Sequence, residues 1–166
     1  MKKLSILLCA LLLTTALFAE NEVTVGFHNF EWGTSMEVFK AKMGNPVHTE
    51  EFNGLQSLVY DNIKVSGYPV FMLAFFSRNG LEGGTYYFDT KNFEELTQCY
   101  KTLQAELVAL YGPTMLYEAL LRETRTYETS WNLPSGYVYL KVNTRSNDPV
   151  TLWYSSPSLT KKLNGS

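Results

Sequence analysis

The sequence predicts an α+β fold in which two α-β-β-β units form an antiparallel sheet with the helices packed on one face. Three observations predict it. Two amphipathic helical patterns each end at a glycine that is followed closely by a proline. Each helix is followed by segments that read as strands. Glycine, proline and asparagine separate these segments at short intervals, as they do in antiparallel hairpins.

The first 19 residues form a separate segment that we interpret as a signal peptide. Lys2 and Lys3 precede an apolar run that continues to Ala19, which is the order of regions in an export signal. We expect cleavage near Ala19, with cleavage after Ala16 as the alternative. An uncleaved anchor is also open, because the run over 4–19 has 16 residues and about 20 are needed to span a bilayer. The remainder, residues 20–166, is predicted to be a single exported domain, periplasmic or secreted from a bacterium.

Charge and composition disfavour some classes of partner. Removing Lys2 and Lys3 from the 14 basic residues leaves 12 against 16 acidic ones, a net charge of −4. An acidic domain of this kind is not expected to bind nucleic acid. No later segment is apolar over enough residues to span a membrane, so the protein is not expected to be an integral membrane protein after cleavage.

Cys99 is the single cysteine after the signal peptide, which excludes an internal disulfide in the exported domain. It lies near the apolar face of the second predicted helix. A buried thiol is one interpretation. A reactive thiol, or one paired with another chain, is the other.

The first unit begins with a loosely alternating segment over 22–32 that predicts a strand. Residues 32–46 then predict a short helix. Thr34 and Glu37 have the spacing of a capping box at its start, and Gly44 and Pro46 mark its end. A helix this short is stable only when its apolar face docks on another element.

The strands of the first unit follow this helix. Residues 47–56 predict a loop or an irregular strand, and residues 57–65 predict a strand. The continuous apolar run over 70–76 favours a strand at the centre of the sheet or covered on both faces. Asn79 and Gly80 predict a hairpin turn, and Gly83 and Gly84 suggest a bulge in the returning strand over 81–89.

The second unit repeats this order with a longer helix. Asn92 begins it, and Gly112 and Pro113 end it. Residues 115–126 are compatible with either helix or strand. Strands are predicted over 127–133, 137–142 and 150–155, and a frayed polar tail over 158–166.

The two units are interpreted as an internal duplication that covers residues 23–90 and 91–157. The segment WGTSMEVFKAKMGNP resembles the helix motif of the BamE/SmpA outer-membrane assembly lipoproteins at the positions Gly33, Ser35, Phe39, Met43, Gly44 and Pro46. A tandem pair of such units is similar in plan to the β-lactamase-inhibitor-protein fold. The resemblance implies a small, exported, non-catalytic protein that binds other proteins through a sheet surface.

The residues themselves show no catalytic or metal-binding pattern. The sequence contains none of the common nucleophile, zinc-protease or phosphate-loop motifs. His48 is followed by two glutamates, but a structural zinc site needs four ligands and no second cluster is present. His28 lies among phenylalanines, and no base or nucleophile is near it in the sequence. We therefore expect no enzyme, no metal and no cofactor.

Aromatic residues on the predicted strands are the candidate binding residues. The chain contains 24 Phe, Trp and Tyr residues, and Tyr and Trp are enriched at protein interfaces. The predicted function is an exported interaction module that binds a protein or peptide partner in the cell envelope through an aromatic-bearing sheet face. The candidate residues are Tyr68, Tyr86, Tyr137, Tyr139, Trp153 and Tyr154.

The alternative function is a periplasmic carrier that holds a small apolar ligand between helix and sheet. It is suggested by the apolar run over 70–76 and by the soft side chains of Met36, Met43 and Met72.

Overall fold

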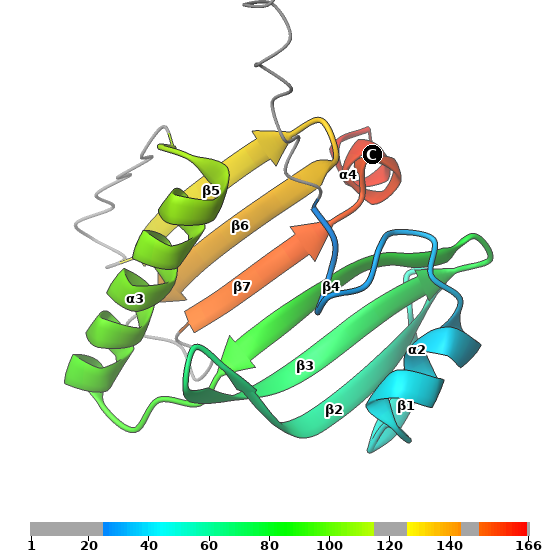
Figure 1. Ribbon diagram of the computed structural model, residues 1–166, viewed down its shortest axis with the longest axis horizontal. Helices are drawn as coiled ribbons and strands as arrows, with labels where there is room; N and C mark the ends of the chain where they lie inside the picture. The colour runs from blue at the N-terminus through cyan, green and yellow to red at the C-terminus, as the bar shows by residue number, and fades with distance from the viewer. Residues whose placement is uncertain (1–24, 115–125, 144–149, 166) are drawn as a thin grey trace, which may run out of the picture.

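The computed structural model describes residues 25–114, 126–143 and 150–165 (Figure 1). Within these ranges, seven strands form one antiparallel sheet in the order β1-β2-β3-β4-β7-β6-β5, and three helices accompany it. The predicted α+β class and antiparallel sheet are confirmed. The predicted signal peptide with its cleavage sites, and the ambiguous residues 115–125, lie outside the described residues.

The elements have the following bounds. The strands are β1 (His48–Phe52), β2 (Leu55–Val65), β3 (Tyr68–Ser77), β4 (Gly80–Phe88), β5 (Thr126–Leu133), β6 (Gly136–Asn143) and β7 (Val150–Ser155). The helices are α2 (Met36–Met43), α3 (Phe93–Tyr111) and α4 (Pro157–Asn164). No helix in the described part of the chain is both long and apolar enough to cross a membrane.

The first helix begins one residue later than the capping-box spacing predicts. Ser35 is the N-cap, and its hydroxyl accepts a hydrogen bond from the Val38 N–H at 3.3 Å. The Thr34 hydroxyl instead donates to the Glu31 carbonyl at 2.7 Å, so it is used by the preceding turn. Gly44 closes the helix with a φ of 84°, as predicted.

The second helix follows its sequence signals closely. The Asn92 side chain caps it by accepting from the Glu95 N–H at 2.9 Å. Gly112 ends it, again with positive φ. The side chains that share its buried stripe are Leu96, Cys99, Tyr100, Leu103 and Leu107.

Two expectations about local structure are wrong, and one open alternative is decided. Residues 25–32 form a tight turn and not a strand, because Phe27 and Phe30 exchange two backbone hydrogen bonds across the tip of the turn. The sequence leaves residues 47–56 open between a loop and an irregular strand, and within them residues 48–52 form a strand that pairs with β2 over its whole length. The predicted frayed tail is helix α4, which Ser156 caps by accepting from the Leu159 N–H at 3.0 Å.

Two adjacent glycines in β4 allow close packing on both faces of the sheet. Successive residues of a strand point to opposite faces. A Cβ atom at Gly84 would lie 2.2 Å from the ring of Phe27, and one at Gly83 would lie 2.8 Å from a methyl group of Leu159 in α4. Phe27 and α4 therefore lie on opposite faces. The predicted bulge is one residue earlier, because the register with β3 shifts around Glu82.

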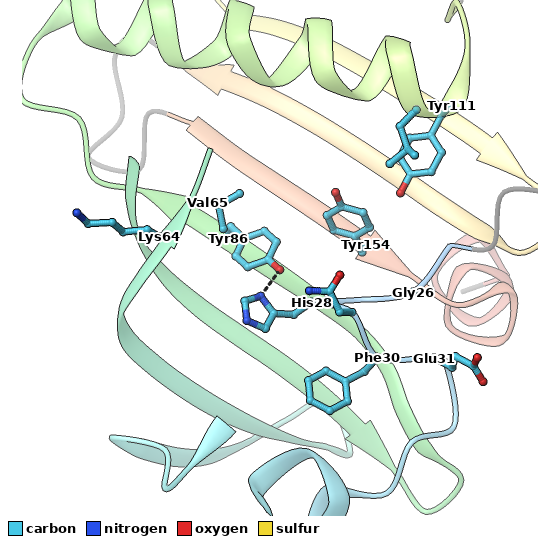
Figure 2. A pocket seen from close by; sticks show the side chains of 11 residues that line it. Gly26, His28, Phe30, Glu31, Lys64, Val65, Tyr86, Tyr111 and Tyr154 are labelled. Atoms are coloured by element: carbon cyan, nitrogen blue, oxygen red, sulfur yellow. Dashed lines mark hydrogen bonds between the residues drawn. The ribbon is translucent and has the colours of Figure 1, made fainter. Parts of the chain in front are cut away.

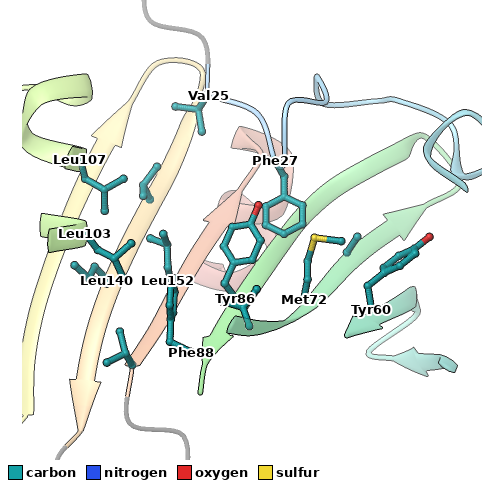
Figure 3. Close-up of a cluster of buried hydrophobic side chains, with 14 of the residues drawn as sticks. Val25, Phe27, Tyr60, Met72, Tyr86, Phe88, Leu103, Leu107, Leu140 and Leu152 are labelled. Atoms are coloured by element: carbon teal, nitrogen blue, oxygen red, sulfur yellow. The ribbon is translucent and has the colours of Figure 1, made fainter. Parts of the chain in front are cut away.

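The main core fills the face on which Phe27 lies. Figure 3 shows Leu103 and Leu107 of α3 over Leu140 and Leu152 of the sheet. At the other end, the Phe39 ring of α2 packs edge-on against Phe76, with 5.3 Å between ring centroids. Each fully buried leucine or phenylalanine side chain contributes about 1.5–3 kcal/mol to the free energy of unfolding. We call this side of the sheet the helix face.

A substitution at Gly84 tests the close packing. Gly84→Ala places a methyl group in the volume of the Phe27 ring, so we expect the free energy of unfolding to fall by about 1–3 kcal/mol. Urea denaturation measures it. The same substitution in a Phe27→Leu background, where the ring is gone, should lower stability by less. An equal loss in both backgrounds would contradict the contact.

Candidate functional site

The face of the sheet opposite the helix face carries a group of aromatic side chains. Tyr137 and Tyr139 alternate with core residues along β6, and their rings are nearly parallel, 6.3 Å apart and inclined by 15°. Tyr139 pairs with Trp153 on β7. The structure thus brings together three of the six candidate residues.

The strand registers extend this surface across the centre of the sheet. Trp153 pairs with Thr85 of β4, which pairs with Leu73 of β3. The Phe75 ring lies 5.2 Å from the Trp153 ring, and Phe71 is 53% exposed. We call the surface formed by Phe71, Phe75, Tyr137, Tyr139 and Trp153 the aromatic face.

Helix α4 crosses one end of the aromatic face and is fixed there by Glu82. This carboxylate is 5% exposed. It accepts hydrogen bonds from the hydroxyl of Ser77, at 2.9 Å, and from that of Ser156. The Glu82 carbonyl also accepts from the Ser156 N–H at 2.7 Å. Hydrogen bonds to a charged group contribute more than neutral ones, so this cluster holds the start of α4.

Three hollows meet at Trp153. The first, of about 340 Å³, is lined by Tyr137, Tyr139, Thr151 and Trp153. A second, of about 170 Å³, lies between Tyr137, Trp153 and the end of α4. The third, of about 530 Å³, lies on the other side of α4. Trp153 lines all three, which places it at the centre of a hollowed surface.

The charges at the edges of the aromatic face are unevenly distributed. Among the described residues that line the largest hollow are two cations, Arg78 and Lys162, and no carboxylate. At the other edge, Lys141 forms an ion pair with Glu128 at 3.4 Å. Burial, followed by a hydrogen bond to Glu128, raises the pKa of Tyr139. The carboxylate on this edge is thus already paired, whereas the largest hollow presents positive charge.

The other three candidate residues lie on the helix face. Tyr86 is 5% exposed and packs against Phe27 with 4.8 Å between ring centroids. Tyr154 also contacts Phe27, and Tyr68 packs edge-on against Phe88. The six predicted residues therefore do not form one surface.

A cleft of about 590 Å³ opens on the helix face between α3, the turn over 27–30 and the sheet (Figure 2). The His28 Nδ1 atom and the Tyr86 hydroxyl are hydrogen-bonded at 2.9 Å. The hydroxyls of Tyr111 and Tyr154 interact with each other. Tyr111 was not expected here, because its position on the apolar stripe of α3 suggests only core packing.

The sulfur-containing side chains in the described part of the chain do not line this cleft. Met72 is fully buried in the core, and Met36 and Met43 pack against it. Cys99 is also fully buried. Burial, with smaller contributions from Glu95 and Glu106, raises the pKa of its thiol to about 12. The thiol is therefore protonated near neutral pH.

No cluster of three or more potential metal ligands occurs among residues 25–114, 126–143 and 150–165. His48 is exposed on β1.

Comparison with known proteins finds no matching family model, no similar curated protein and no similar solved structure.

Removing the Glu82 carboxylate tests the anchoring of α4. Glu82→Ala leaves the hydroxyls of Ser77 and Ser156 without this acceptor, so we expect a loss of about 1–3 kcal/mol of stability. Hydrogen exchange measured by mass spectrometry should show α4 exchanging faster than β6. Glu50→Ala, at an exposed position on β1, is the matched control and should change neither. Faster exchange spread evenly over the sheet would argue against local anchoring.

The pH dependence of stability tests the environment of His28. Burial lowers the pKa of His28 below its ordinary value of 6.5. The unfolded chain then takes up a proton at higher pH than the folded protein. This part of the stability is present above about pH 6.5 and is lost as the pH falls towards the folded pKa.

Asparagine tolerates the positive φ at position 28, so His28→Asn keeps the turn. Between about pH 7 and about pH 5 it should lose less stability than the wild type. Urea denaturation at the two pH values measures the difference. Equal losses of stability in the wild type and the variant would show that His28 does not contribute to the pH dependence of stability.

Proposed function

We propose that the protein is an exported, non-catalytic interaction module that binds a protein or peptide partner through the aromatic face. The observation that carries the proposal is the meeting of Tyr137, Tyr139 and Trp153 on the face opposite α2 and α3, with hollows on both sides of Trp153. Buried hot spots at interfaces are enriched in Trp, Tyr and Arg.

The shape and chemistry of the aromatic face favour a polypeptide partner. The three hollows share Trp153 in their linings, which suits several side chains of one segment. Among the described residues that line them there is no histidine, cysteine or carboxylate. The serine, threonine and lysine side chains described in these linings therefore have no histidine, cysteine or carboxylate beside them in the lining to act as a partner base or nucleophile.

The charge of the largest hollow indicates the kind of segment. Arg78 and Lys162 line it without a carboxylate among their described neighbours in the lining. An acidic side chain of the partner would meet complementary charge here, while an aromatic or aliphatic side chain would pack on Trp153. The proposed occupant is therefore a peptide segment in which acidic residues flank an apolar anchor.

We also propose that the chain is a tandem of two α-β-β-β units, similar in plan to proteins that bind partners through a sheet surface. Each helix, α2 and α3, precedes the strands of its half in sequence. The last strands of the two halves, β4 and β7, pair antiparallel at the centre of the sheet. This arrangement supports a tandem of α-β-β-β units like that of the β-lactamase-inhibitor-protein fold, with an additional short strand, β1, in the first unit. A periplasmic or secreted location follows from the predicted signal peptide.

Selection of peptides from a random library displayed on phage tests the proposed function. Selected sequences should contain aromatic or aliphatic residues flanked by Asp or Glu. Trp153→Ala should weaken binding of the selected peptides by at least about tenfold, the loss expected for a hot spot. The double variant Arg78→Ala, Lys162→Ala should weaken it and reduce its dependence on salt.

Tyr68→Ala, a truncation of a partly buried tyrosine on the helix face, is the control and should leave affinity unchanged. Selection of basic peptides, or affinity that survives Trp153→Ala in a folded variant, would contradict the proposal.

A further inference from the structure

The cleft on the helix face is a second place where the chain could hold a ligand. It is separate from the aromatic face, because the two lie on opposite sides of the sheet, and its volume of about 590 Å³ is within the range of small-molecule sites, about 300–1,000 Å³. Its lining comes from distant parts of the chain: the turn over 27–30, the end of β2, the strands that carry Tyr86 and Tyr154, and the end of α3. Figure 2 shows these side chains around one space.

The tyrosine and histidine side chains that line the cleft are uncharged near neutral pH. Burial raises the pKa of Tyr86, Tyr111 and Tyr154 above the ordinary tyrosine value, and burial lowers the pKa of His28. Each hydroxyl, and a neutral imidazole, can both donate and accept a hydrogen bond. The cleft therefore offers polar groups that adapt to either role without carrying charge.

Among the described residues of the lining, the charged ones are confined to its rim. Lys64 and Glu31 are both exposed, and they have opposite signs. A charged ligand inside would lose its hydration without gaining a counter-charge from the buried wall, which is unfavourable. Phe30, Val65 and Leu110 supply apolar wall between the polar groups. Such a wall suits the faces of a ring.

The turn that brings His28 into the cleft is held in a strained conformation. His28 and Asn29 both have positive φ, 53° and 65°, although neither is glycine. Non-glycine residues adopt such angles at an energetic cost, and the strain tends to be kept where it serves a function. Here the turn is fixed by Phe27, which packs into the space above Gly84. The result is an imidazole placed against Tyr86.

We propose that this cleft binds a small uncharged ring compound that carries hydrogen-bonding groups on its edge. The ring faces contact the apolar wall, and the edge groups exchange hydrogen bonds with Tyr86, Tyr111, Tyr154 and His28. This ligand is more polar than the apolar one that the methionines suggested. The proposal does not depend on the partner of the aromatic face.

Three matched probes test the proposal on the exported chain near neutral pH. They are para-hydroxybenzamide, which is uncharged, para-hydroxybenzoate, which is an anion, and tyramine, which is a cation. Titration followed by NMR should show saturable binding of the amide and shifts of the His28 ring signals. The amide should bind at least about tenfold more tightly than either charged probe, a difference of about 1.4 kcal/mol.

Variants that remove single hydroxyls locate the site. Tyr86→Phe and Tyr111→Phe keep the rings, and each should weaken binding of the amide by about two- to tenfold, the effect of one lost hydrogen bond. Tyr139→Phe, on the aromatic face, is the matched control and should have no effect. The proposal is overturned if the amide shows no saturable binding at millimolar concentration, if a charged probe binds as tightly, or if Tyr139→Phe weakens binding as much as Tyr86→Phe.

Discussion

The packing of both ends of the described chain against the middle of the sheet depends on the absence of two side chains. Gly84 admits the ring of Phe27 on one face, and Gly83 admits Leu159 on the other. Glycine weakens a strand because it loses more conformational freedom and contributes no side-chain contact. In β4 that loss is offset by burial, since nearly every residue of the strand is covered. The two neighbouring elements, the turn over 27–30 and α4, both pack directly against this strand.

The two faces of the sheet differ in chemistry as a result. On the helix face, Phe27 occupies part of the space between α2 and α3, and the part left open is lined by tyrosines and His28. On the opposite face, α4 covers only one end, so that Tyr139 and Trp153 stay accessible beside Arg78 and Lys162. One surface is neutral and recessed, and the other is broad with positive charge at its edge. A single sheet can thus present two sites of different character without either interfering with the other.

Local signals in the sequence predict most of the elements, and distant contacts explain the failures. Asn92, Gly44 and Gly112 mark helix ends because capping is decided within a few residues. Helix α4 is missed because its polar sequence buries a single leucine, whose partner Gly83 is far away in the chain.

The positions of the candidate binding residues are also only partly predictable from local sequence signals. Alternation assigns Tyr137 and Tyr139 to one side of β6, and Trp153 and Tyr154 to opposite sides of β7. It cannot assign Tyr86 to the helix face, because that depends on where α3 and Phe27 dock. The cleft is less predictable still, since its residues come from segments that meet only in the folded chain.

The pairing of β4 with β7 joins strands that lie more than sixty residues apart in the sequence. Before β7 pairs with β4, β4 has an unpaired edge, and no strand connects β5 and β6 to the first half of the sheet. Closing so long a loop costs conformational entropy before any contact between the strands compensates for it, and this cost slows folding. We therefore expect the pairing of β4 with β7 to be the last to form during folding. A chain that ends before residue 150 leaves an open edge on which another copy can pair.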